Sequence, residues 1–428
     1  MAISKSSKKI LIMFLFTALF LLVYRLGAQI IMPFISPEAL VTEGLGAKMF
    51  GFLDVFTGGA LSNFSILALG ISPYITSSIV IQLLQMDIVP TLKEWSEEGE
   101  TGKQKLSQLT KYVALGLAFI QSLTLTIGIG TNYQDIYLGN SPFIFVYLAI
   151  IATAGTAFSM WLAEKITAKG IGNGSSMLIV TGILASFPQM FMELWTQFIT
   201  DSGTVGDIIK FFVILLLLVF IIVAIAFMES AQRKIPIQYA NRPAAASFRG
   251  KSDSNIPIKL NSASVIPVIF ASTLMSLPQL IISIGNLNLE SGVGYWLHQT
   301  FSTTETIGFI VYIILIFVFS FFYAFLQINP EKMSENLQKN NAYIPGVRPG
   351  EETASYLARV LFKITMVGAT YLSLVAVIPI IISSAFKLTS SAIQIGGTGL
   401  IIVVGVAIET YKQLKTQMQE KQYRGFIN

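Results

Sequence analysis

The stretch that decides the fold is Val55–Met86, VFTGGALSNFSILALGISPYITSSIVIQLLQM, which runs for 32 residues without a charge. The hydrocarbon core of a bilayer accommodates about 20 residues of helix. A helix of 32 residues would extend about 48 Å, at about 1.5 Å per residue. The stretch is therefore too long for one membrane span and too short for two. We interpret it as a short segment that enters the membrane and stops, followed by a full span from Ile71 to Leu84.

The first part of this stretch, Thr57–Ser65, is rich in small and hydroxyl-bearing residues, which is unusual for a helix that faces lipid. Non-helical backbone at membrane depth is tolerated only where protein or a water-filled cavity surrounds it. The stretch therefore predicts a cavity, and a cavity inside a membrane protein indicates transport.

The composition of the whole chain is that of a polytopic membrane protein. Hydrophobic residues make up 53% and charged residues 12% of the sequence, and the mean hydropathy is +0.68, whereas a soluble domain has about 25% charged residues. The apolar run that begins at Ile10 continues past the length of a signal peptide and is better read as a first span. Cysteine is absent, which excludes disulfides and thiolate metal sites.

Ten membrane-spanning helices are predicted from the apolar runs. They cover about residues 10–32, 71–87, 108–130, 142–163, 174–195, 207–228, 262–285, 306–328, 361–385 and 397–411. With the N-terminus inside, 24 of the 28 basic residues fall on the cytoplasmic side, which predicts that both termini are cytoplasmic. Two explanations of the positive charge in these loops stay open. It reflects the membrane topology alone, or some of the loops dock an acidic or RNA-rich partner.

Ten spans divide into two halves of five, residues 1–200 and 201–428, and an odd number per half would place the second half inverted relative to the first. Pro73 near the start of the second span and Pro267 near the start of the seventh occupy matching positions, which favours a transport path between the halves. The two largest loops, about residues 229–261 and 329–360, are both cytoplasmic, and loops of that length are usually functional.

Ionisable residues, which usually mark ion coupling or catalysis inside a membrane, are almost absent from the predicted spans. Glu164, Glu229 and Glu409 lie at cytoplasmic helix ends, and Arg25 is expected to reach the membrane interface. We therefore expect no enzyme, no cofactor and no metal site. An inverted-repeat secondary transporter for a small solute is the alternative to a channel, but no buried charge offers it a binding site. Isoleucine-rich stretches instead suit a pathway that an apolar constriction can close by dewetting.

Motifs along nearly the whole chain resemble the bacterial SecY family of protein-conducting channels. They are YRLG (24–27), EGETGK (98–103), GT (155–156), MWL (160–162), GIGNG (170–174), QRKIPIQYA (232–240), IPIKLN (256–261), QINPE (327–331), ENL (335–337), YIPGVRPG (343–350) and GGT (396–398). Each motif is modest, but together and in this order they are highly specific.

The resemblance implies an all-α channel of ten transmembrane helices in two inverted five-helix halves, with a short re-entrant plug helix at about residues 57–66. Such a channel passes unfolded secretory proteins across the membrane and releases transmembrane segments laterally into lipid. The plug would comprise Gly58, Gly59, Ala60, Leu61, Ser62, Asn63 and Phe64. A ring of apolar side chains would close the pore, and motif matching places it at Ile71, Ile75, Ile179, Ile269 and Ile402.

The resemblance also implies a lateral gate between spans two and three on one side and seven and eight on the other. Gln82 and Asn261 are either its polar members or ordinary polar residues in helix packing. Arg348, projected by the turn between Gly346 and Pro349, would dock the motor SecA or the ribosome, and Arg242 and Arg249 are second choices. A guanidinium suits both carboxylates and phosphates.

The partners expected from the resemblance are SecE, SecG, SecA, the ribosome, secretory and membrane protein substrates and anionic lipids, without direct DNA binding. The location implied is the bacterial plasma membrane.

Overall fold

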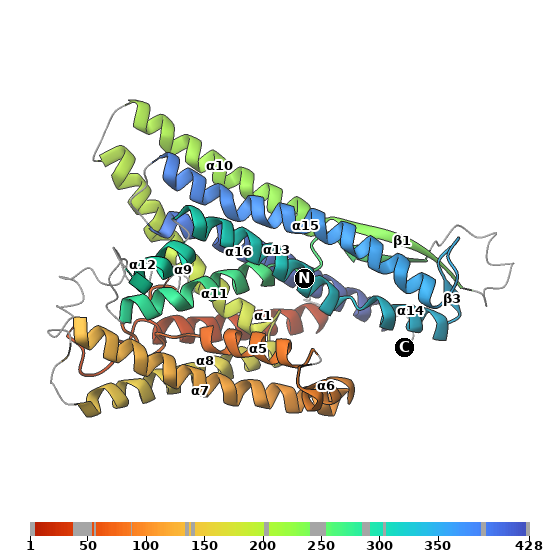
Figure 1. The fold of residues 1–428 in the computed structure, drawn as a ribbon, viewed down its shortest axis with the longest axis horizontal. Coiled ribbons are helices and arrows are strands. Elements are labelled where there is room, and N and C mark those ends of the chain that lie inside the picture. Colours follow the sequence, from red (N-terminus) through yellow and green to blue (C-terminus); the bar gives the residue numbers. More distant parts are fainter. Residues whose placement is uncertain are drawn as a thin grey trace.

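The computed structural model describes residues 5–36, 54, 57–86, 88–132, 137, 142–200, 205–239, 254–284, 292–302, 305–386 and 391–424. These parts form a bundle of long helices with a small sheet at one end (Figure 1).

Helices occupy the positions of the ten predicted spans. They are α1 (Lys5–Gly27), α5 (Ser72–Leu84), α7 (Glu100–Asn132), α8 (Pro142–Lys169), α9 (Gly174–Trp195), α10 (Val205–Ser230), α11 (Ile266–Ile284), α13 (Thr306–Gln327), α15 (Glu351–Ala385) and α16 (Ser391–Arg424). Among the described residues, 7 helices are long and apolar enough to cross a membrane, and shorter apolar helices cover Ser72–Leu84 and Ile266–Met275. The predicted class, an all-α polytopic membrane protein, is confirmed.

Three of these helices are much longer than a membrane is thick. The helices α7, α15 and α16 contain 33, 35 and 34 residues, which corresponds to about 50 Å against a hydrocarbon core of about 30 Å. They start or end eight or more residues outside the predicted spans, because hydropathy detects only their apolar part. Glu100 in α7 and Glu351 in α15 lie in the first turn, where a carboxylate stabilises the positive end of the helix dipole.

Shorter helices connect the long ones. The helix α6 (Pro90–Glu97) follows α5, α12 (Gly292–Phe301) precedes α13, α14 (Pro330–Lys339) follows α13, and a π-helical turn, η2 (Thr196–Thr200), extends α9. Figure 1 places α6 and α14 at the same end of the bundle as the sheet, and α12 at the opposite end.

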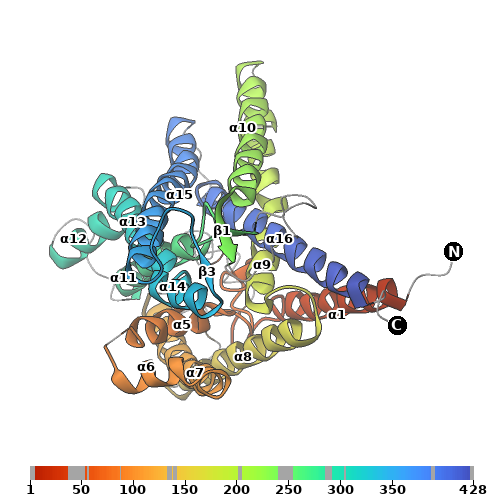
Figure 2. The same cartoon turned by 90° about the vertical axis from the view of Figure 1, so that its right-hand side faces the viewer.

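The long helices pack in two groups. In the first group α7 packs against α5 and α8, and α8 packs against α1 and α9; in the second, α13 and α16 pack against α15, α11 against α13, and α10 against α16. The groups meet where α9 contacts α16 and where α11 contacts α5 and α7. Figure 2 shows α5, α7 and α8 of the first group below the green and blue helices of the second.

The two large loops contribute strands to one three-stranded sheet, which the sequence does not predict. Strand β1 (Gln232–Tyr239) pairs antiparallel with β2 (Ser254–Lys259) of the same loop and with β3 (Ala342–Tyr343) of the other, in the order β2-β1-β3. Alternate residues of β1, Ile235 and Ile237, are buried in a small apolar core shared with Leu357 and Leu361 of α15. This core holds the two loops together at the end of the bundle.

Candidate functional site

Five isoleucines from four parts of the chain belong to one large hydrophobic core. Ile71 is the N-cap of α5 and Ile75 lies in its first turn, while Ile179, Ile269 and Ile402 come from α9, α11 and α16. Ile75 is half-buried and the other four are buried. Because α5 and α9 belong to the first helix group and α11 and α16 to the second, the cluster lies where the groups meet. The structure thus places all five predicted ring positions in the same core, and the ring itself stays a prediction.

The sequence interpretation missed Ile183, which is fully buried in the same cluster one helical turn after Ile179. A Cβ on Gly399 of α16 would lie 2.9 Å from Cγ2 of Ile183, so this glycine allows α16 to approach α9 closely. The spacing of four residues from Ile179 places both side chains on one helix face, which is a signal that could have identified Ile183.

The five isoleucine side chains offer no chemistry for a particular solute. They carry no hydrogen-bond donors, acceptors or charges. An apolar constriction of this kind closes by excluding water. It can open for any passing chain that pushes the side chains apart.

The plug segment Gly58–Phe64 forms consecutive turns, where a short helix was expected; the helical residues Asp54 and Thr57 precede it. Gly58 and Gly59 have φ angles of 69° and 84°, which lie in the left-handed region that interrupts a right-handed helix. The small residues that suggested a plug therefore produce turns at this position.

Backbone hydrogen bonds join the end of the plug segment to the chain that follows α1. The amide of Met32 donates to the carbonyl of Phe64 at 2.9 Å, and the amide of Ile66 donates to the carbonyl of Ile30 at 2.9 Å. On the other side, a Cβ on Gly155 of α8 would lie 2.0 Å from the carbonyl oxygen of Ile66. The segment is thus held against helices of the first group.

Two charged residues hold the plug segment, and neither role was expected. The guanidinium of Arg25 on α1, predicted to reach the membrane interface, donates to the carbonyl of Gly58. Asp54 accepts hydrogen bonds from the amide of Ser62 at 2.8 Å and from its hydroxyl. Burial raises the pKa of Asp54, and the hydrogen bonds from Ser62 oppose that shift.

Gln82 lies at a contact between the two helix groups. Its amide oxygen, on α5, accepts a hydrogen bond from the hydroxyl of Tyr323 on α13, and its amide nitrogen donates to Ser78 at 3.3 Å. The ring of Tyr323 packs against Phe270 of α11 with centroids 4.8 Å apart. Tyr323 was not predicted, because it lies in an aromatic-rich apolar run where its hydroxyl is not distinctive.

Asn261, the second predicted gate residue, does not contact the first helix group through its amide. Its amide nitrogen donates to Oε2 of Glu229 and to the carbonyl of Ser264, both at 3.0 Å. The predicted span starts at 262, but α11 starts at Ile266, so Asn261 lies in the preceding turn. The expectation of a gate contact is corrected: Asn261 ties the end of α10 to the start of α11.

Arg348 is presented on a rigid turn. Gly346 and Gly350 on either side have φ angles of 83° and 100°. The carbonyl of Arg348 accepts a hydrogen bond from the hydroxyl of Thr353 at 2.7 Å. The carbonyl of Gly350 accepts one from the hydroxyl of Ser334 at 2.7 Å. The Arg348 side chain remains 87% exposed, with Glu352 at 3.9 Å. The backbone is therefore fixed while the guanidinium is free to contact a partner.

The other two predicted docking residues, Arg242 and Arg249, lie outside the described residues. Within the described parts of the chain, no group of three or more His, Asp or Glu side chains could hold a metal ion.

Comparison with known proteins identifies the family. A family model described as SecY matches residues 65–411. Protein translocase subunit SecY of Halalkalibacterium halodurans is 45% identical over 415 residues, 96% of each chain. The subunit of the same name from Bacillus subtilis is 42% identical, covering 96% of this chain and 95% of that one.

Solved structures share the fold. One structure, described as a protein-conducting channel, matches with a TM-score of 0.63 and 18% identity. The match covers 95% of this chain and 92% of the channel chain. Canine Sec61 in a ribosome-channel complex matches with a TM-score of 0.61 and 17% identity over the same shares of the two chains. The family model, the two relatives and the shared fold agree, and the chain therefore belongs to the SecY family of protein translocase subunits.

Proposed function

We propose that this chain is the central channel subunit of a bacterial Sec translocon. It passes unfolded secretory proteins across the plasma membrane and releases transmembrane segments sideways into lipid. The observation that carries the proposal is that both helix groups contribute these isoleucines to the core between them, and their side chains have no chemistry for a small solute. The alternative of a small-solute transporter is not supported by the comparisons, whose named relatives are translocase subunits.

The roles of the site residues are part of this proposal. Ile71, Ile75, Ile179, Ile269 and Ile402 seal the pore, and the turns of Gly58–Phe64 block it from the external side. The packing of the helices in two groups supports a division into halves at about residue 200, and we propose that the two halves are inverted relative to each other. The Gln82–Tyr323 contact between α5 and α13 supports a lateral gate at this junction.

The chain performs no catalysis of its own in this proposal, and partners supply the energy. We propose SecE and SecG as companion subunits, SecA or the ribosome as docking partners, and anionic lipids around the basic cytoplasmic side, where both termini lie. Two similar structures, of canine Sec61 and yeast Ssh1, are complexes with ribosomes. The exposed guanidinium of Arg348 supports docking at this end of the bundle.

The test of the pore uses the absence of cysteine from the chain. A cysteine replaces Ile179, a second is placed in a stalled secretory protein, and the complex is oxidised in native membranes. We expect a disulfide between the two chains, because the passing chain must contact the seal. The matched control is Ile120→Cys on α7, where the isoleucine is 63% exposed on the outside of the bundle. Crosslinking at 120 but not at 179, in a complex active in export, would refute the pore assignment.

A further inference from the structure

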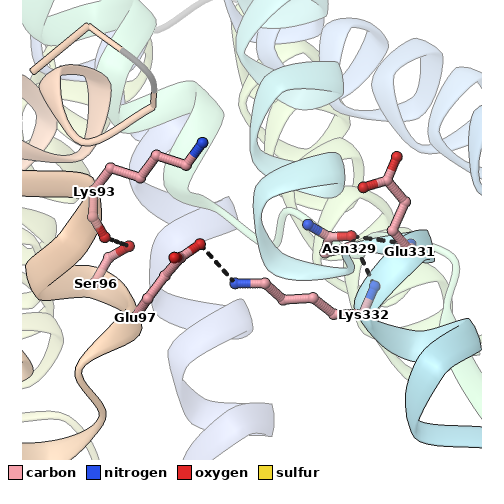
Figure 3. Close-up of polar contacts among 6 residues, drawn as sticks. All are labelled: Lys93, Ser96, Glu97, Asn329, Glu331 and Lys332. Atoms are coloured by element: carbon pink, nitrogen blue, oxygen red, sulfur yellow. Dashed lines mark hydrogen bonds and ion pairs between the residues drawn. The ribbon is translucent and has the colours of Figure 1, made fainter. Parts of the chain in front are cut away.

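An ion pair joins the two helix groups at the end of the bundle that carries the sheet. Glu97, the last residue of α6, and Lys332, in the first turn of α14, approach to 3.9 Å between Oε1 and Nζ. Figure 3 shows the two side chains extended towards each other across the space between the helices. The helix α6 follows the gate helix α5, and α14 follows the gate helix α13 after only Ile328 and Asn329.

The backbone that carries Lys332 is fixed at the start of α14. The side-chain oxygen of Asn329 accepts hydrogen bonds from the amides of Glu331 at 3.0 Å and Lys332 at 3.1 Å, and Figure 3 shows both. This N-cap satisfies amides that have no partner inside the helix. Buried Ser334, one turn on, donates to the carbonyl of Gly350 at 2.7 Å, so α14 is also anchored to the Arg348 turn.

The helix α6 packs against α7 of the first group. Leu92 is buried, and the hydroxyl of Ser96 donates to the carbonyl of Lys93 at 2.7 Å in the last turn (Figure 3). The neighbouring ion pairs stay within one helix group: Glu98 pairs with Lys105 at 2.8 Å, and Glu335 pairs with Lys339 at 3.6 Å. Glu97 and Lys332 differ from these pairs because they connect the groups.

We propose that Glu97 and Lys332 form a latch that favours the closed state of the lateral gate from its cytoplasmic end. This inference rests on the proposed gate between α5 and α13. Because α6 and α14 directly follow these helices, separating α5 from α13 lengthens the distance between the two charges. A partner that binds either charge would release the latch and favour opening.

The latch is weak and sensitive to salt. The two side chains are 64% and 55% exposed, so water and ions screen their attraction. Exposed ion pairs of this kind change an equilibrium by at most about fivefold. A contact of this size suits a gate that must open in use, and it acts together with the Gln82–Tyr323 hydrogen bond.

The test measures the open fraction of the gate in the full-length channel complex in lipid nanodiscs. Fluorophores are attached to Thr101→Cys at the start of α7 and Gln338→Cys near the end of α14, which belong to different groups. We expect Glu97→Lys or Lys332→Glu to raise the open fraction up to about fivefold at low salt. The double variant Glu97→Lys/Lys332→Glu should restore it, and the difference should disappear at high salt.

Two control variants make the same charge changes on the same helices. Glu94→Lys on α6 and Lys339→Glu on α14 should leave the open fraction unchanged. The latch is refuted if the double variant does not restore closure, or if the controls act like the latch variants.

A parallel variant, Tyr323→Phe, separates the latch from the gate itself. If Tyr323→Phe raises the open fraction but the charge variants do not, the latch is wrong and the gate stands. If none of the variants changes it, both assignments are wrong.

Discussion

At the scale of single residues, the hydroxyl of Tyr323 is the polar atom that connects α13 to Gln82 of α5. Both side chains lie in apolar helices. Without this hydrogen bond, the hydroxyl of Tyr323 and the amide oxygen of Gln82 would face apolar side chains. The contact can therefore favour closure without needing any charge inside the membrane.

We predict that Tyr323→Phe raises the open fraction of the gate about threefold, because hydrogen bonds between membrane helices contribute about 0.6 kcal/mol on average. The lateral release of a weakly hydrophobic test segment into lipid, measured in reconstituted vesicles, should rise accordingly. The matched control is Tyr312→Phe, since Tyr312 lies on the same helix and its buried hydroxyl has no hydrogen-bond partner among the described residues. An equal effect of both variants would show that ring packing, and not the hydrogen bond, is responsible.

Arg348 provides a second test at this scale. Arg348→Glu should reduce motor-driven export about tenfold or more, because losing one member of an interfacial charge pair typically costs about 2–5 kcal/mol. Initial rates of export into inverted vesicles measure the effect, and co-purification of the companion subunits checks that the complex remains intact. Arg359→Glu makes the same charge change on α15 at an exposed position, and export should continue at its normal rate.

The residue scale also shows which site residues can be predicted from sequence. Gln82 is recognisable because it is an amide in an apolar helix, whereas its partner Tyr323 is one aromatic residue among several. Arg25 was expected to reach the membrane interface, but it donates to a carbonyl 33 residues later. Hydrogen-bond partners that are distant in the sequence depend on the fold, and the residue type of one side chain does not identify them.

At the scale of elements, the plug segment depends on close backbone approaches. Gly155 of α8 faces the carbonyl of Ile66, which follows the plug turns. Any side chain at 155 must push this carbonyl away, because α8 is a continuous helix with little freedom to move.

We predict that Gly155→Ala destabilises the docked plug by about 1–3 kcal/mol, the usual cost of overpacking. A cysteine in place of Leu61, which is 4% exposed, should then react faster with a water-soluble thiol reagent. The matched control is Gly116→Ala on α7, where an added Cβ would meet nothing within 4 Å. Unchanged labelling in Gly155→Ala would mean that the plug does not depend on this contact.

The sheet shows what the sequence could not predict at this scale. Strand β1 alternates buried and exposed residues, but it is short, contains Pro236 and lies in a charged loop. Its pairing of Tyr239 with Ala342 joins residues about a hundred positions apart, and no local pattern indicates such a partner. The long helices, in contrast, were predictable because the apolar residues of each helix form a continuous run in the sequence.

At the scale of the whole molecule, the proposed function places the pore and the lateral gate at the junction between the two helix groups. The isoleucine cluster, the Gln82–Tyr323 hydrogen bond and the Glu97–Lys332 ion pair all lie across this junction. The positions of the helices in the predicted spans, and the placement of the five isoleucines in the core, could be predicted from hydropathy and motifs. The distances across the junction could not, because they depend on how two separately packed groups fit together.

In the proposed mechanism the junction opens for lateral release, and a crosslink across it should prevent this. We predict that cysteines replacing Gln82 and Tyr323, joined by a short bifunctional thiol reagent, abolish the release of transmembrane segments into lipid. The matched control joins Lys111→Cys on α7 to Glu164→Cys on α8, which form an ion pair within the first group; this crosslink should leave release intact. A cleavable reagent should restore release when it is cut. Normal release by the crosslinked Gln82–Tyr323 channel would place the exit to lipid at another junction, because the two helices could no longer separate.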